Sequence, residues 1–544
     1  MNAHEDGSAR ARFRVVAPVG RAPVGARWAL TSDTFAQSFR DAFAGLEVQV
    51  ADTLGAGSTR TITWSPRGLS DLTLSGVIRA DATLSALAEL VKSMPRTIDA
   101  GWLEKLIAIV GEGTLARECR ELLEPPPPPP GAEPEVSTSV ALSETGEKGE
   151  IEALFERAEA AAKPVGASAV DAFVQAMRGA PGPSPSKSAA SPDGARRVRD
   201  HLERAVFRVA RAVLDDPTLA RMESSWRALR WFVEQSPASS GVRLEIIDAP
   251  SERALELLRA IPYDGDFEDP DLFAVVPPVA DVETLRALAE LAEERLAPCI
   301  VSRDPARDAD QLLDWLGSEN AARELRALRA EEASRWLCIA HNEAVLFDEG
   351  AGELARTVLG SPVWALLASI AASYRATGSF ARIVGQAGQL RAPATTTLST
   401  GRDAGTALPT RHFTSIRAQS ELEALGVLGL GSPRNSDRIS LSSAPMVRGA
   451  ADAVPLPAQI WAGRIARFTE WVRGQLPPDA SSDTAREIFE QAASVFLYPG
   501  AERSAMLTAE IVESGGRRAL QVGARIHSSH ALVPLDLEFA VPLA

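Results

Sequence analysis

The chain has 544 residues, a formal net charge of −15, 45% apolar residues and 24% charged residues. This length predicts about three or four domains with sizeable cores. The acidic balance argues against nucleic acid or an anionic membrane as a partner, because both select for a basic face. Cysteine is sparse, with no CxxC pair, and no apolar run reaches the roughly 20 residues of a membrane span. We therefore expect a soluble cytoplasmic protein without membrane insertion.

Three short segments of the N-terminal part, 12–18, 46–52 and 59–65, predict strands, the second by clean alternation of Leu46, Val48 and Val50 against polar residues. A helix is predicted over 102–124, interrupted at Gly111 and Gly113. We interpret residues 1–123 as one N-terminal module.

Six consecutive prolines at 125–130 open a Pro/Ser-rich linker, which we place at 124–196. Within it, the segment 151–163 predicts a short helix with one narrow apolar stripe. The stripe contains Ile151, Leu154, Phe155 and Ala158.

The rest of the chain predicts an α/β core over 197–400 and a C-terminal domain over 401–544. The glycine-rich segment 426–432 is predicted to be a loop. Helices are predicted at 197–214, 217–235, 281–297, 320–334, 362–377 and 460–476, and strands at 241–250 and 298–303.

The last forty residues change to a period of two. Segments 504–514 and 519–528 flank Gly515 and Gly516 and predict a hairpin, and 533–543 predicts a third strand. The third strand alternates Leu535, Leu537, Phe539 and Val541 against Asp536, Glu538 and Ala540. The predicted fold class is therefore α/β, with mixed sheets flanked by helices and an antiparallel C-terminal meander.

Few residue patterns in the sequence are typical of catalytic or metal-binding sites. His527 and His530 lack the further ligands that tetrahedral zinc requires, and His201, His341 and His412 have no partner nearby in the sequence. There is no P-loop and no GxSxG elbow. We expect no enzyme, no metal and no cofactor; the alternative is a hydrolase whose site is assembled from scattered residues.

The segment 214–234, LDDPTLARMESSWRALRWFVE, predicts an unusually aromatic helix with Asp216 as N-cap and Pro217 at the first helical position. Two interpretations remain open: a domain-core helix, or a helix whose face partly meets another subunit. The candidate subunit-packing residues are Glu223, Trp226, Arg227, Leu229 and Trp231.

This segment also resembles a helix in the large subunit of the type VI secretion contractile sheath, the TssC or VipB family. The matching positions are Pro217, Leu219, Met222, Glu223, Trp226, Arg227 and Leu229, while Ala228 replaces the family's glycine. Four later segments, 277–305, 361–378, 409–430 and 519–544, resemble family segments in the same order. The resemblance covers about residues 150–544.

The resemblance implies a structural protomer that forms a helical polymer around an inner tube and contracts to expel it, with no catalytic residue. The implied partners are other copies of the chain, the tube protein Hcp, the baseplate and the AAA+ disassembly ATPase ClpV. By position, 1–123 is similar to the small sheath subunit (TssB or VipA), which predicts a TssB–TssC fusion; a separate small subunit is the alternative. A sheath-like cap or baseplate adaptor is the alternative function.

Two further roles follow from the resemblance. Strand exchange between protomers would use Leu535, Leu537, Phe539 and Val541. The helix at 151–163, with Ile151, Leu154 and Phe155, would be the handle for disassembly, or it would simply dock on the adjacent module.

Overall fold

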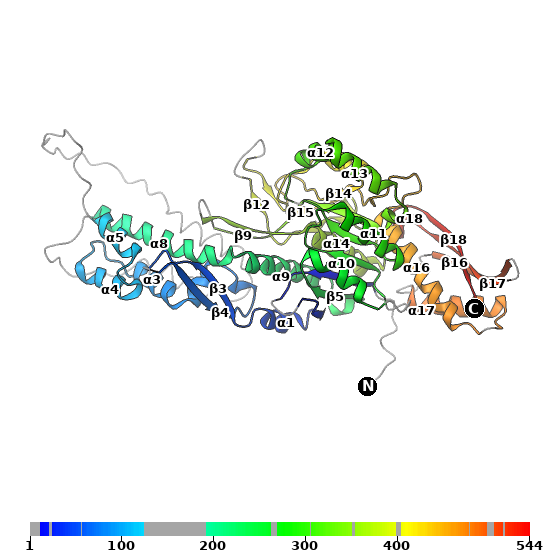
Figure 1. Cartoon of the computed structure of the whole chain (residues 1–544), viewed down its shortest axis with the longest axis horizontal. Helices are drawn as coiled ribbons and strands as arrows, with labels where there is room; N and C mark the ends of the chain where they lie inside the picture. The colour runs from blue at the N-terminus through cyan, green and yellow to red at the C-terminus, as the bar shows by residue number, and fades with distance from the viewer. Residues whose placement is uncertain are drawn as a thin grey trace. The chain divides into compact units, whose positions relative to one another are not determined.

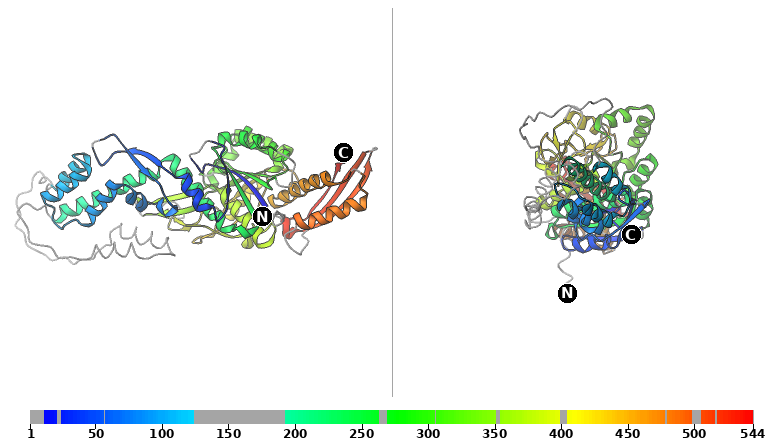
Figure 2. Two further views of the ribbon diagram at one scale, coloured as in Figure 1. Left: turned by 90° about the horizontal axis from the view of Figure 1, so that it is seen from below. Right: turned by 90° about the vertical axis from the view of Figure 1, so that its left-hand side faces the viewer.

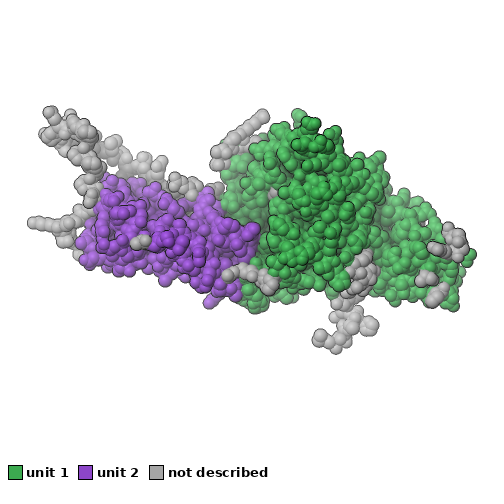
Figure 3. All heavy atoms as spheres, viewed as in Figure 1, with its two compact units in different colours: residues 1–42, 224–348, 357–544 green, residues 43–223, 349–356 purple. Residues whose placement is uncertain are grey.

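The computed structural model describes residues 11–20, 24–55, 57–123, 192–262, 269–304, 306–350, 354–398, 404–477, 479–497, 505–514 and 517–543. The chain divides into two compact units, each assembled from segments that are far apart in the sequence (Figure 3). Unit 1 contains Met1–Ala42, Ser224–Asp348 and Thr357–Ala544, and unit 2 contains Phe43–Glu223 and Glu349–Arg356.

A seven-stranded sheet forms the centre of unit 1 (Figure 1). Its neighbouring strands are parallel, except that the edge strand β2 runs antiparallel to β5. In spatial order the strands are β14 (Val427–Gly429), β8 (Leu337–His341), β7 (Cys299–Ser302), β6 (Leu272–Val275), β1 (Ala11–Ala17), β5 (Val242–Asp248) and β2 (Arg27–Leu30). The segment 426–432 was therefore wrongly predicted as a loop only, because it supplies the edge strand β14.

Strand β1 lies inside this sheet, between β5 and β6. Ala11 pairs with Val242 and Phe13 with Leu272, so this strand near the N-terminus joins strands more than 200 residues away. The predicted strand at 12–18 is confirmed, but the structure divides the N-terminal part differently from the predicted module 1–123. Residues up to 42 belong to unit 1 and the following ones to unit 2. The residues of β1 predict a strand but contain no signal for its distant partners.

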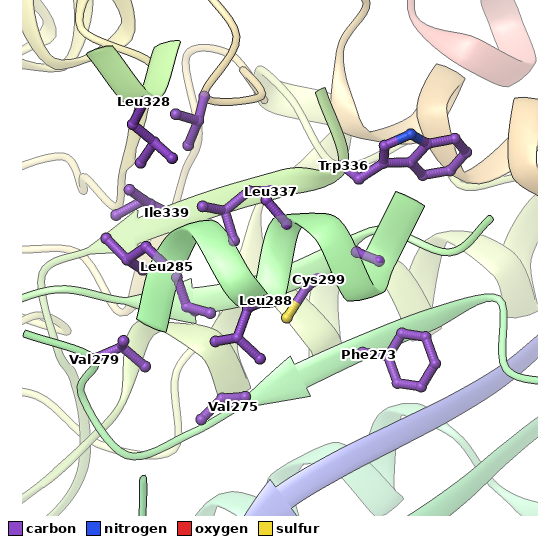
Figure 4. Packing of buried hydrophobic residues seen from close by; sticks show 14 of the residues in the cluster. Phe273, Val275, Val279, Leu285, Leu288, Cys299, Leu328, Trp336, Leu337 and Ile339 are labelled. Carbon is purple, nitrogen blue, oxygen red and sulfur yellow. The ribbon is translucent and has the colours of Figure 1, made fainter. Parts of the chain in front are cut away.

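Helices cover both faces of the sheet. On one face, α10 (Ser251–Ala260), α11 (Val282–Glu294), α12 (Ala309–Gly317), α13 (Glu319–Ala330) and α15 (Ile416–Ala424) contribute to one apolar cluster with the strands (Figure 4). On the other face, Phe13 of β1 contacts Phe232 of α9 (Pro217–Gln235), which contacts Trp364 of α14 (Pro362–Thr377). The predicted α/β class, with a mixed sheet flanked by helices, is confirmed.

The C-terminal strands form a separate three-stranded antiparallel sheet within unit 1, in the order β16 (Ala505–Ser514), β17 (Arg517–Ile526) and β18 (Leu535–Pro542). Two helices, α16 (Leu456–Gln475) and α17 (Ser482–Phe496), pack against these strands, and Figure 2 shows them in orange beside the red strands. The predicted meander is confirmed, while its turn at Gly515 and Gly516 lies outside the described residues.

Unit 2 is built on the long helix α8 (Pro192–Leu214). This helix packs against α2 (Leu74–Ala80), α3 (Ala82–Lys92), α5 (Thr114–Leu123) and the hairpin strand β3 (Leu46–Ala51), which pairs with β4 (Thr59–Trp64). The predicted helix at 102–124 is two helices, α4 (Ala100–Val110) and α5, separated where Gly111 takes a φ of 76°.

The remaining elements are short. They are α1 (Phe35–Ala42), α18 (Ser528–Ala531) and the two-stranded pairs β9 (Ala344–Glu349) with β10 (Arg356–Gly360), β11 (Leu390–Arg391) with β15 (Arg438–Ile439), and β12 (Thr396–Thr397) with β13 (Ala407–Leu408). None of the helices in the described ranges combines the length and apolar character that a membrane span needs.

Each unit contains described residues from both sides of the segment 124–191, which makes the interleaving testable. If a protease site placed within 124–191 is cut after folding, the two fragments should elute together on size-exclusion chromatography and separate only in denaturant. Uncut protein is the control. Fragments that separate in native buffer would contradict the interleaved architecture.

Candidate functional site

Trp226, the centre of the aromatic helix, is completely buried within unit 1. The rings of Trp28, Phe35 and Phe39 meet it edge-on, with centroids 5.8, 5.4 and 5.4 Å away. Its Nε1 donates a hydrogen bond of 2.7 Å to the carbonyl of Val19. Edge-to-face pairs add about 0.5–1.5 kcal/mol each beyond area burial. The N-terminal segment is thus fixed to α9 by an aromatic cluster.

The proposed subunit-packing side chains are all buried within this one chain. Trp231 donates from Nε1 to the carbonyl of Arg391 at 3.0 Å, and the Arg227 guanidinium lies 3.8 Å above the ring of Phe347. A face that is already covered inside the chain cannot also meet another subunit. The prediction of subunit packing by Glu223, Trp226, Arg227, Leu229 and Trp231 is therefore corrected, and the core interpretation holds.

The predicted start of this helix is confirmed. The Asp216 carboxylate accepts hydrogen bonds from the backbone N–H groups of Thr218 and Leu219.

Glu223 has an electrostatic role inside unit 2. Arg356 forms ion pairs with Glu223 and with Glu349, the latter at 3.1 Å, and Glu349 also accepts from the backbone N–H of Leu74 at 3.2 Å. Burial raises the pKa of Glu349, and the positive charge of Arg356 opposes that shift. One guanidinium thus binds two carboxylates, and Arg356 links Glu223 to Glu349 within the core.

The histidines of the described residues have structural surroundings. His341, at the end of β8, is buried; burial, followed by nearby His412, lowers its pKa to about 4. His527 accepts a hydrogen bond from the backbone of Ser529 and caps α18. Throughout the described ranges, no three His, Cys, Asp or Glu side chains are placed to hold a metal ion together.

A cavity close to β8 and β14 is too small for a substrate. It encloses about 10 Å³, which is about the room of one water molecule. Its lining consists of Arg303, Leu312, Trp315, Leu316, Leu325, Ile339 and Val427.

A buried ionic anchor, which the sequence reading missed, holds α16 to the seven-stranded sheet. Arg464 and Arg467 of α16 bind the two carboxylate oxygens of Asp271 at 2.8 and 2.7 Å. The same carboxylate accepts from the backbone N–H of Arg12 at 3.0 Å. Asp271 is 3% exposed and each arginine 1%. One feature of the sequence could have indicated that these arginines are buried. Arg464 and Arg467 are three residues apart, and apolar Ile465 and Phe468 directly follow them.

The candidate strand-exchange residues lie on one face of the terminal sheet. Their β17 partners on that face, Leu520, Val522, Ala524 and Ile526, are buried. On β18, Leu535 and Val541 are buried, whereas Leu537 and Phe539 are half-buried. The opposite face is polar and includes an exposed ion pair between Arg525 and Asp536 at 2.9 Å.

The outer edge of β18 carries the backbone groups that do not face β17. The backbone N–H of Leu543 donates to the carbonyl of Arg518, so these two residues form a hydrogen-bonded pair. Hydrogen-bonded and non-hydrogen-bonded pairs alternate along an antiparallel ladder. The odd-numbered residues of β18 therefore direct their backbone groups toward β17, and the even-numbered residues direct theirs away from it. We call the outward groups of Asp536, Glu538 and Ala540 the β18 edge. Within the described part of the chain, β18 has a strand neighbour on one side only.

Among the comparisons with known proteins, the one with solved structures finds similar chains. No protein-family model matches the chain. No curated protein matches it either. Among solved structures, the chain is similar to the sheath complex of the PVC extracellular contractile injection system in its contracted state, with 11% identity, a TM-score of 0.34, and coverage of 55% of this chain and 76% of that chain.

Two other similar structures are also sheath proteins. The contracted helical sheath of the anti-feeding prophage has 12% identity and a TM-score of 0.33, covering 54% of this chain and 76% of that chain. A sheath tail protein from Desulfitobacterium hafniense has 10% identity and a TM-score of 0.30, covering 53% and 58%. Likeness of this degree assigns neither a family nor a function to the chain.

The ionic anchor yields a stability prediction. Asp271→Ala leaves two buried guanidinium groups without their carboxylate and should destabilise the protein by about 3–5 kcal/mol in urea unfolding. Asp536→Ala removes an exposed ion pair, which is the matched control, and should change stability little. Equal effects of the two substitutions would refute the anchoring role of Asp271.

Proposed function

We propose that the chain is a structural protomer of a contractile injection sheath, in which copies join into a helical polymer around an inner tube and contract to drive the tube out. The observation that carries the proposal is the β18 edge, together with the sequence resemblance over about 150–544. A sheath protomer must connect to its neighbours by links that survive a large rearrangement, and added β-strands supply such links.

The chemistry of the β18 edge suits strand addition. A strand from a second copy would pair with the outward N–H and C=O groups of Asp536, Glu538 and Ala540. Without such a partner, an exposed edge of this kind promotes aggregation. Its apolar side chains would extend the face that includes the half-buried Leu537 and Phe539. Backbone pairing would provide affinity, and the apolar face would provide register.

The ionic anchor supports a mechanical role. A link that transmits force must be attached to the body of the protomer. In unit 1, α16 packs on β17 and β18 and is joined through Arg464 and Arg467 to Asp271, directly before β6. Force on the terminal sheet would therefore pass into the central parallel sheet.

Among contractile sheaths, we propose the cytoplasmic type VI system, on the strength of the sequence resemblance. The partners would be the tube protein Hcp, the baseplate, the disassembly ATPase ClpV and, as an alternative to a fused module, a separate small sheath subunit. The fused small-subunit-like part would be limited to residues 43–123, because β1 and β2 belong to the sheet of unit 1. The handle residues Ile151, Leu154 and Phe155 lie outside the described residues, and their role remains part of this proposal.

A proline at the β18 edge tests the function. Glu538→Pro removes an outward N–H without removing a ladder bond to β17, whereas Leu537→Pro would break the meander itself because that N–H faces β17. Glu538→Pro should leave a folded monomer that forms no tubes by negative-stain microscopy. Glu538→Ala, which keeps the N–H, should still form tubes.

Tubes of normal length with Glu538→Pro would contradict the proposal that β18 links the subunits. Short capped particles from the wild-type chain would instead indicate a cap or baseplate adaptor.

A further inference from the structure

The other edge of the terminal sheet, along β16, is not open in the same way. Ile511 directs its backbone groups away from β17, and both are occupied by one side chain. Its N–H donates to Ser482 Oγ at 3.1 Å, and Ser482 Oγ donates to its carbonyl at 3.0 Å. Ser482, the first residue of α17, therefore occupies the position that a residue of a neighbouring strand would take.

The alternation of the ladder agrees with this assignment. Leu520 of β17 pairs with Val541 at a hydrogen-bonded position, so its groups face β18 and not β16. Its partner on β16 is Ile511, whose groups must consequently face outward. The outward groups of Leu507, Ala509 and Ile511 form what we call the β16 edge.

Two further contacts hold α17 at this edge. Arg518 of β17 donates to the carbonyl of Ala480, just before the helix begins. Helix α17 also packs against β16, and its Phe489 meets Phe468 of α16 edge-on with a centroid distance of 5.1 Å. The start and the body of the helix are thus fixed beside β16.

We propose that Ser482 and α17 close the β16 edge, so that a strand from a second copy of this chain can join the terminal sheet only at β18. This inference rests on the proposed function for its partner and goes beyond it by assigning the direction of assembly. An unprotected edge on each side of one sheet would allow a second, uncontrolled pairing. With one edge closed, each terminal sheet accepts one added strand, and the linkage is directional.

Amide exchange tests the closure in the isolated chain. Ser482→Ala removes the hydroxyl at a helix position where alanine is well tolerated. It should speed exchange of the Ile511 amide roughly tenfold, since a hydrogen bond is lost. Ser482→Thr keeps the hydroxyl and is the matched control. If the exchange rate of the Ile511 amide is the same in Ser482→Ala as in the wild type, the proposal is overturned.

A rescue experiment then tests the consequence for assembly. Glu538→Pro alone should be monomeric by light scattering, and the double variant Glu538→Pro/Ser482→Ala should self-associate through the newly opened β16 edge. A double variant as monomeric as Glu538→Pro would overturn edge closure even if wild-type tubes form normally. Association of Ser482→Ala in a chain whose wild type forms no tubes would instead support closure while rejecting the sheath function.

Discussion

The pairing of β1 between β5 and β6 is the constraint on which the rest of the structure depends. In a parallel sheet, a central strand bonds on both sides, so its loss would leave two unpaired inner edges. Because β1 comes from the start of the chain and its neighbours follow residue 241, the central sheet cannot be completed by either side of the 124–191 segment alone. The aromatic contacts of Trp226 with Phe35 and Phe39 reinforce the same long-range closure.

Local patterns in the sequence predicted the elements well and their partners poorly. Period-two alternation located β16, β17 and β18, and the cap at Asp216 located α9, because these signals depend on neighbours in the chain. The position of β1 depends on residues more than 200 positions away, which no local period encodes. Arg464 and Arg467 resemble surface residues of a helix in the sequence. Their burial depends on Asp271 and on the carbonyls of Phe496 and Leu296, which come from other parts of the chain.

The terminal sheet is asymmetric in a way that suits directional assembly. One edge is occupied at Ile511 by a serine side chain. The other directs backbone groups outward around Glu538, where no strand among the described residues pairs with them. The buried charges of the ionic anchor join the helix beneath this sheet to the central sheet. Buried ion pairs contribute little net stability but are costly to break, so they favour a fixed geometry over a flexible one.

Amide exchange of the assembled protein against the unassembled chain tests the central claim most directly. The outward amides of Glu538 and Ala540 should exchange rapidly in the single chain and become strongly protected in the polymer. The Ile511 amide, already bound to Ser482, should be protected to the same degree in both states. Polymers in which Glu538 and Ala540 still exchange as in the single chain would contradict an account in which β18 links neighbouring protomers.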